Sequence, residues 1–361
     1  MKSINEEKKL LQIILGITDF SLIDSKLDIK AFDYYKEYAN SLINKLNIES
    51  IVYDSKNPLY KFDFDYLNYF YIDGYVDHKN QTDIVRINEG VIFKIVKMFY
   101  SILSHFPILP HLKESFSESF GMRLFYVFDK QKFEMEYRLP VDRKRKIIAE
   151  YLSMFAIKYI ILHEIGHLYN GHIFLVLKNV SLSSQISMLN NKNFSIKALD
   201  LQTMEMDADA FAISRLIDES LVMIEKDKLL LSVLDNKLEI YFLLIYAIHC
   251  LFLLIKEEQN GNNLSHLPRL VRDMINLDCA KTNIIFKANN IITGKKFMEM
   301  AYSSYFEAEQ NYNIVFNKIT NMDEINECTN PQVLNNVKMV EANWVVLKEK
   351  LKPYARIRLA D

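Results

Sequence analysis

Two histidines four residues apart, with a glutamate between them, are the residues of this chain best suited to chemistry. They form the string His163-Glu164-Ile165-Gly166-His167, which has the pattern H-E-x-x-H. On an α-helix, residues i and i+4 lie on one face, so both imidazoles can bind one metal ion. Glu164 then lies where a carboxylate can take a proton from water activated by that metal. The pattern therefore predicts a zinc site with a general base.

The residues around this pattern predict a helix that can hold it. Residues 147–168 contain no proline, and apolar side chains recur at helical spacing between Ile148 and Leu162. We expect the helix to begin near Asp142. Ligands on a packed helix are held more rigidly than ligands on a loop, which favours catalysis. The alternative is a buried helix with two structural histidines, but its unpaired polar groups would each cost several kcal/mol.

A catalytic zinc usually has three protein ligands, and the sequence offers two places for the third. The nearer is His172, which directly follows Asn170-Gly171. On a continuing helix His172 would point about 140° away from His167. If Asn170-Gly171 instead ends the helix with a left-handed cap, the direction of His172 stays open. His172 is therefore an alternative third ligand.

The other place is the acidic segment Met204–Ala212. Its apolar residues follow helical spacing, so Glu205 and Asp209, four residues apart, are predicted to share one face. One of these carboxylates can bind the metal while the other holds a ligand imidazole through its free N–H. Small residues at Ala208 and Ala212 would let this helix lie close to the first one. The alternative explanation is an ordinary solvated acidic face.

Together these motifs resemble those of the gluzincin zinc metallopeptidases. The resemblance rests on His163-Glu-x-x-His167 followed by Glu205-x-x-Ala208-Asp209. It implies that Zn²⁺ is the cofactor, that Glu205 is the third ligand and that Asp209 orients a ligand histidine. The string HEIGHLYNGH is similar to the HtpX-type branch of these enzymes. The same order of elements occurs in the Lit-type phage-exclusion peptidases.

A later segment is also similar to the HtpX-type branch. Residues 265–272, SHLPRLVR, resemble the motif H-P-x-x-x-R, although Leu267 separates the histidine from the proline. The resemblance implies that His266, with Arg269 or Arg272, stabilises the oxyanion of the reaction. In all, the resemblance covers residues 145 to 275.

The expected fold class is α+β and mainly helical. A zincin-like catalytic domain, with C-terminal helices, is expected over residues 121–361, and a smaller N-terminal α+β region over residues 1–120. Alternating and amphipathic patterns predict strands and one helix within these regions. The strands are expected at 60–66 and 82–87, the helix at 89–105, and a further strand pair at 124–137.

Composition agrees with a soluble globular enzyme. Half of the residues are apolar, and 25% are charged, with a formal net charge of −2. This charge gives no reason to expect nucleic acid or an anionic membrane as a partner. The N-terminus lacks an apolar run of signal-peptide type, and the three cysteines have no C-x-x-C spacing. We therefore expect a cytoplasmic protein whose partner is a protein or peptide substrate; the oligomeric state is not predicted.

One segment raises the question of a membrane. Residues 240–255 are apolar except for His249, and Glu239 and Lys256 lie at the ends of the run. As a helix the run spans about 24 Å, short of a hydrocarbon thickness of about 30 Å. HtpX-type enzymes are membrane proteins, which favours the alternative. We predict a central buried helix in which His249 is a hydrogen-bonded core histidine.

The sequence as a whole favours a zinc-dependent endopeptidase that acts on a protein substrate. The resemblance to the Lit-type peptidases adds a regulatory or phage-defence setting. Two alternatives stay open. One is a non-catalytic partner protein that uses zinc structurally, although such a site would not need the base Glu164. The other is a membrane-bound quality-control protease.

Overall fold

The computed structural model describes residues 31–53, 56–67, 69, 71–105, 108–109, 122–128, 133–179, 197–258, 267–319, 326 and 329–360. Helices dominate these residues, and two small sheets accompany them, which confirms a mainly helical α+β fold. In chain order the elements are α2 (Ala31–Val52), β1 (Lys61–Leu67), β2 (Gly74–Lys79), β3 (Thr82–Asn88), α3 (Glu89–Leu103), β4 (Met122–Phe128), β5 (Phe133–Leu139), α4 (Arg143–Tyr169), α5 (His172–Asn179), α6 (Ala198–Lys226), α7 (Lys228–Val233), α8 (Glu239–Glu258), α9 (Arg269–Lys287), α10 (Gly294–Phe316) and α12 (Pro331–Leu351).

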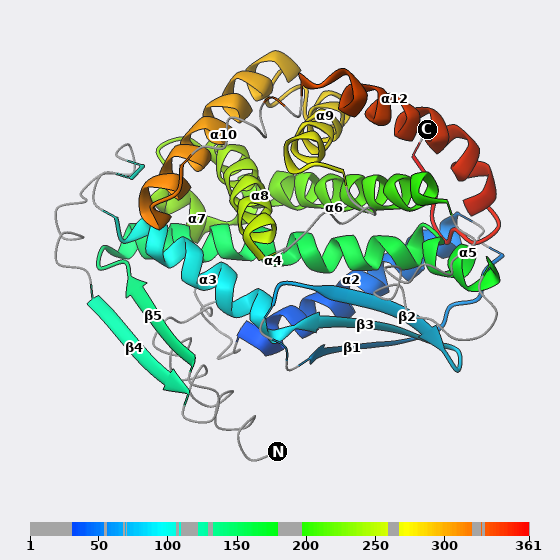
Figure 1. Ribbon diagram of the computed structural model, residues 1–361, viewed down its shortest axis with the longest axis horizontal. Helices are drawn as coiled ribbons and strands as arrows, with labels where there is room; N and C mark the ends of the chain where they lie inside the picture. Colours follow the sequence, from blue (N-terminus) through cyan, green and yellow to red (C-terminus); the bar gives the residue numbers. More distant parts are fainter. Residues whose placement is uncertain are drawn as a thin grey trace.

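Helix α4 carries the H-E-x-x-H pattern and lies at the centre of the molecule. Figure 1 shows it between the sheet of β1, β2 and β3 on one side and helices α6 and α8 on the other. Its side chains from Ile147 to Leu162 are buried, because a helix that is packed on several sides needs apolar residues all round. Asp142 caps its first turn by accepting a hydrogen bond of 2.9 Å from the backbone N–H of Arg145. The predicted start of the helix is confirmed.

Arg145 fixes the start of α4 against the end of α3. Its fully buried guanidinium donates to the backbone carbonyls of Leu103 at 2.7 Å, Ile108 at 2.9 Å and His105 at 3.1 Å. The last carbonyls of a helix have no partner within the helix, and a cation there also offsets the helix dipole. Arg145 therefore sets the direction in which the long helix α4 crosses the core.

The three-stranded sheet has the order β1-β3-β2. Strand β1 is parallel to β3, and β2 is antiparallel to β3. Asn80 and Gln81, with φ of 52° and 59°, make the tight turn between β2 and β3. Phe64, Val85 and Val76 lie side by side in the register and are buried. The predicted strands are confirmed, and this buried row faces the core that contains α4.

Helix α8 is the apolar segment that raised the question of a membrane. Among the described residues it is the one helix that is long and apolar enough to span a bilayer, with a mean hydropathy of 1.9 over Glu239–Glu257. However, 78% of that stretch is buried inside the protein. His249 Nδ1 lies 3.1 Å from Asp273, and its Nε2 lies 2.8 Å from Glu309. The predicted buried helix and its hydrogen-bonded histidine are confirmed.

The segment after α12 returns to the end of α4. The backbone N–H of Arg356 donates to the carbonyl of Tyr169 at 2.8 Å. The buried Arg356 guanidinium binds both carboxylate oxygens of Asp83 on β3. It also lies over the rings of Tyr60, Tyr169 and Phe174, within about 5 Å of their centroids. This C-terminal clamp joins β3, the end of α4 and α5.

One hydrophobic core includes residues on both sides of position 120. It contains Tyr35 of α2 and Val85 of β3 as well as Ile148 of α4 and Leu244 of α8. The predicted division into an N-terminal region and a catalytic domain therefore has no break in the core to mark it, and it stays a prediction.

Candidate active site

His163, His167 and Glu205 meet between α4 and α6. The Nε2 atoms of the two histidines are 3.1 Å apart. The carboxylate oxygens of Glu205 lie 3.4 Å from His163 Nε2 and 3.5 Å from His167 Nε2. Two donor atoms bound to one tetrahedral zinc at about 2.0–2.1 Å lie about 3.3 Å apart. The three side chains therefore fit one zinc ion in donor type and in spacing.

The close packing of α4 on α6 brings these residues together. Gly166 faces Phe211 of α6, and a Cβ at position 166 would lie 3.1 Å from an atom of that ring. Ala208 and Ala212 are fully buried along the same stretch of α6. A glycine and two alanines thus allow the backbones to approach closely enough for a Glu205 side chain to reach two histidines on the other helix.

Asp209 lies behind His163. Its Oδ1 is 2.8 Å from His163 Nδ1, and Arg272 donates to both of its oxygens at 2.7 and 2.8 Å. Burial raises the pKa of the Asp209 carboxyl, but Arg272 and His163 outweigh burial and hold that pKa well below its usual range. Asp209 is therefore ionised. It keeps the proton of His163 on Nδ1 and leaves Nε2 directed at Glu205.

His172 lies behind His167. Helix α4 ends at Tyr169, and Gly171 has a φ of 87°, so of the two alternatives that the sequence left open the structure has the left-handed helix end. The break lets α5 begin at His172 and turn that ring back, so that its Nδ1 lies 2.9 Å from His167 Nδ1. Its Nε2 lies 3.0 Å from Asp207. Both ring nitrogens of His172 thus face partners other than the point where the Nε2 atoms and Glu205 meet.

Glu164 lies against strand β2. A Cβ at Gly74, the first residue of β2, would lie 3.0 Å from both Cγ and Cδ of Glu164. Burial raises the pKa of the Glu164 carboxyl, and His163 opposes this while Asp73 and Glu205 add to it; the result is about 8. A carboxyl whose pKa is close to neutral pH can both accept and return a proton.

The two facing histidines differ in protonation. Burial lowers the pKa of His163, but hydrogen bonds to Asp209 and Glu205 outweigh burial and raise that pKa to about 10. Burial holds the pKa of His167 well below its ordinary value. The higher pKa of His163 favours a proton on that ring when no cation is bound. A metal ion would displace that proton, so metal binding here is expected to weaken in acid.

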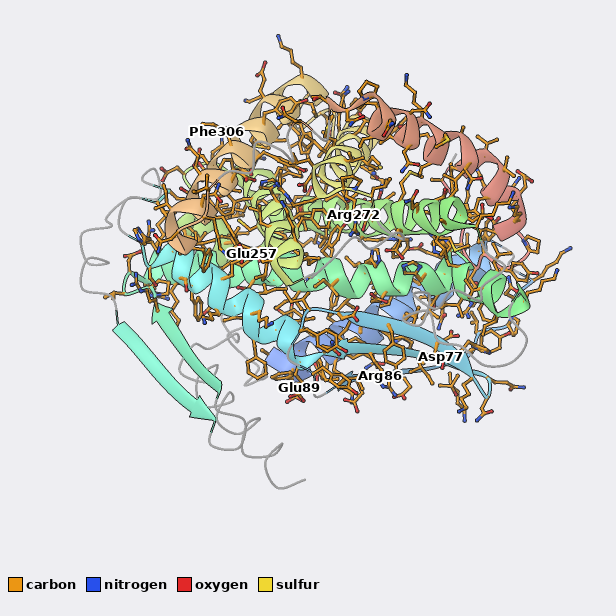
Figure 2. All side chains as sticks on the ribbon, viewed as in Figure 1. Asp77, Arg86, Glu89, Glu257, Arg272 and Phe306 are labelled. Atoms are coloured by element: carbon orange, nitrogen blue, oxygen red, sulfur yellow. The ribbon has the colours of Figure 1, made fainter. Side chains whose placement is uncertain are left out.

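Arg272 and Arg269 lie in different places, although one turn of α9 separates them. Arg272 of α9, labelled in Figure 2, donates to both carboxylate oxygens of Asp209 on α6. Arg269 Nη1 lies 3.4 Å from both Asp273 and Glu309, in the cluster around His249. The predicted oxyanion role of either arginine stays a prediction.

His266 lies outside the described residues. Its neighbour Leu267 lines a small hollow between α6 and α9, together with Glu205, Asp209 and Arg272. The segment that begins at Leu267 therefore runs beside the candidate metal ligands. The role of His266 itself stays a prediction.

Asp207 was not among the predicted site residues. Helical spacing places Glu205 and Asp209 on one face and Asp207 on another, so Asp207 had no predicted partner. In the structure it is buried and accepts hydrogen bonds from Asn170 at 2.6 Å and from the His172 ring at 3.0 Å. These partners lie at the end of α4, and no local pattern in the acidic segment indicates them.

Comparison with models of known protein families gives a match to part of the chain. Residues 129–276 match the model of a family described as Peptidase U49. This stretch is less than half of the 361 residues, but it contains the H-E-x-x-H helix, the acidic segment of α6 and Arg272. No curated protein and no solved structure matches the chain. The family match supports a peptidase, and thus a hydrolase.

Proposed function

We propose that this protein is a zinc-dependent endopeptidase with His163, His167 and Glu205 as the zinc ligands. The observation that carries the proposal is the convergence of two imidazole Nε2 atoms and one carboxylate within 3.1–3.5 Å of one another. The match to a peptidase family supports the hydrolytic class. The zincin-like character of the domain rests on the same residues and on the resemblance to gluzincins.

Glu164 is the residue that moves the proton in this proposal. A bound zinc would polarise the scissile carbonyl and make a water molecule acidic enough to attack it. Glu164 takes the proton of the attacking water and passes it to the leaving amine. Asp209, held by Arg272, keeps His163 in the ligating tautomer. His266, with Arg269 or Arg272, remains the proposed stabiliser of the oxyanion.

Strand β2 supports an extended peptide as the substrate. Among the described strands, β2 pairs with β3 alone and lies at one edge of the sheet. Its first residue, Gly74, contacts Glu164. A peptide in an extended conformation can add to a strand edge through main-chain hydrogen bonds. Such a peptide would pass beside the base that its cleavage requires.

The setting of the reaction follows from the resemblance alone. We propose a cytoplasmic protease that acts on a protein substrate in a regulatory or phage-defence role, as in the Lit-type peptidases. This step rests on analogy between site motifs.

The substitution Glu164→Gln tests the enzymatic proposal. Glutamine keeps the size of the side chain but cannot accept the proton, so zinc and fold should persist while hydrolysis is lost. The measurement compares new protein termini in cells that express the wild type, Glu164→Gln or the control Glu225→Gln, an exposed glutamate of α6. The control should match the wild type. The same new termini in cells with Glu164→Gln would contradict an enzymatic role.

Metal analysis tests the ligand set. One zinc per chain is expected in the wild type, with severe loss in His163→Ala, His167→Ala and Glu205→Ala. Full zinc occupancy in Glu205→Ala, together with loss in His172→Ala, would instead assign the third position to His172.

A further inference from the structure

Four polar side chains form a continuous chain of contacts behind His167. His167 Nδ1 lies 2.9 Å from His172 Nδ1, and His172 Nε2 lies 3.0 Å from Asp207 Oδ2. Asn170 Nδ2 donates to the same oxygen at 2.6 Å. The His172 side chain is fully buried, and those of His167 and Asp207 are nearly so. Solvent therefore cannot replace these hydrogen bonds.

The directions of these bonds follow from the task of His167. When its Nε2 serves as a metal ligand, its proton must lie on Nδ1. His167 Nδ1–H then donates to His172 Nδ1, which must be unprotonated. The proton of His172 is left on Nε2, from which it is donated to Asp207. The one acceptor at the far end thus fixes the tautomer of both rings.

We propose that His172 and Asp207 are positioning residues that hold His167 in its ligating tautomer and orientation. His172 is then a relay between a ligand and a carboxylate rather than a ligand. The inference rests on the proposed metal site. In this arrangement the two ligand histidines are held differently. His163 contacts its carboxylate Asp209 directly, while His167 reaches Asp207 through a second imidazole.

The backbone around His172 holds the relay in place. Gly171 has a positive φ, and a Cβ there would lie 2.7 Å from the backbone of Tyr354 in the C-terminal segment. Asn170, which directly follows α4, donates to Asp207 from the other side. The turn between α4 and α5 therefore fixes the His172 ring against His167 rather than letting it swing towards Glu205.

Zinc affinity of His172→Phe is the first test, measured by competition with a chromophoric chelator. Phenylalanine keeps an aromatic ring in the buried space but removes both nitrogens. Loss of a group that orients a metal-bound histidine typically weakens metal binding 10–100-fold, and we expect a loss of that order. The matched control is His78→Phe, because His78 also pairs with a carboxylate, Asp83, but lies outside the relay. The control should bind zinc as tightly as the wild type.

Substitution of Asp207 gives a signature that a purely structural role would not give. Asp207→Ala removes the acceptor, whereas the amide oxygen of Asp207→Asn can still accept from His172 Nε2–H. We expect Asp207→Ala to weaken zinc binding, whereas Asp207→Asn should keep most of the wild-type zinc affinity. Nitrogen-15 NMR of histidine-labelled, zinc-loaded protein should show His172 with its proton on Nε2 in the wild type and in Asp207→Asn.

Three results would overturn the relay. A wild type that binds zinc, with His172→Phe binding it equally well, would show that His167 needs no support from His172. A loss in His172→Phe as complete as that in His163→Ala would make His172 a ligand. His172 with its proton on Nδ1 would reverse the assigned directions. Absence of zinc from the wild type would instead reject the proposed function itself, and the relay with it.

Discussion

Gly74 controls where the carboxylate of Glu164 can lie. We predict that Gly74→Ala lowers turnover while zinc content is unchanged. The new Cβ would lie 2.9–3.0 Å from Ile87 Cδ1 and from Cγ and Cδ of Glu164, so the glutamate must move. A misplacement of about 1 Å in a catalytic group can cost on the order of 10²-fold in rate. The measurement is kcat on a cleaved peptide together with bound zinc.

Gly294→Ala is the control for this substitution. Gly294 is equally crowded, because a Cβ there would lie 2.8 Å from Ile285. Gly294 begins α10 and Ile285 lies in the last turn of α9, and neither residue belongs to the proposed site. This variant is expected to be less stable with normal turnover. Normal turnover in Gly74→Ala as well would mean that Glu164 tolerates displacement.

His266 carries a second prediction at this scale. An oxyanion donor contacts the substrate and not the metal, so His266→Ala should lower turnover by on the order of 10²-fold or more while it spares zinc affinity. Steady-state kinetics and chelator competition on the same samples separate the two effects. A structure with bound substrate in which His266 lies far from the scissile carbonyl would exclude the role.

The sequence predicted site residues that are close along one helix. His163 and His167, or Glu205 and Asp209, share a face because helix geometry alone fixes spacing of four residues. It could not predict that Arg272 binds Asp209, because that contact depends on how α9 lies on α6. Nor could it orient His172, whose direction depends on the single backbone conformation of Gly171.

Helix α9 joins the site to the buried core at the scale of elements. Arg272 on one turn binds Asp209, and Asp273 and Arg269 on the same helix contact His249 of α8 and Glu309 of α10. A shift of α9 would therefore disturb the support of His163 and the packing of α8 together. Substitutions in the cluster around His249 can test this connection without changing any proposed metal ligand.

We predict that His249 stabilises this packing in a pH-dependent way. Burial lowers the pKa of His249, but Asp273 and Glu309 outweigh burial and Arg269, so the folded-state pKa is raised. A raised folded-state pKa stabilises fully below the unfolded value of about 6.5 and less as pH rises through the folded value. The difference in unfolding free energy between wild type and His249→Gln should therefore be larger at about pH 6 than at about pH 9.

Urea unfolding at the two pH values measures this difference. His78→Gln, which removes a histidine that contacts a different carboxylate, Asp83, controls for a general effect of pH on unfolding. A difference that stays constant would show that folding leaves the pKa of His249 unshifted, and one that grows towards alkaline pH would show that folding lowers it; either result would contradict the prediction.

The sequence predicted single elements better than their contacts. The alternating aromatic residues before Leu67 and the apolar run of α8 were sufficient, because each pattern reports the burial of its own residues. The strand order β1-β3-β2 could not be predicted in this way, since a parallel pair between β1 and β3 depends on where the chain crosses over. Local patterns contain no such information.

The C-terminal clamp carries a prediction for the whole molecule. Arg356→Met should lower the free energy of unfolding by about 3–5 kcal/mol, because it removes the buried guanidinium from Asp83 and leaves that carboxylate with the His78 ring as its remaining side-chain partner. Arg356→Lys keeps the charge but not the bidentate contact with the carboxylate, so we expect a smaller loss of stability. Equilibrium unfolding measures both. If the free energy of unfolding of Arg356→Met is within about 0.5 kcal/mol of the wild-type value, the clamp does not contribute measurably to stability.

No sequence pattern indicates this clamp. Arg356 lies in a short segment without a regular pattern, and its partners Asp83, Tyr169 and Phe174 come from two distant parts of the chain. A buried arginine is unusual unless it is paired, but burial itself cannot be recognised from one residue in an irregular segment.

Because a protein is synthesised from its N-terminus, the ribosome releases the H-E-x-x-H helix long before it releases Arg356. During that interval Tyr354 is not yet packed behind the turn that carries His172. The carbonyl of Tyr169 also lacks the hydrogen bond that the backbone N–H of Arg356 later donates. A nascent chain would thus hold the ligands and the base without the segment that fixes their surroundings. The site residues would therefore reach their final surroundings only once the last helix and its tail have packed behind the His172 turn and the end of α4.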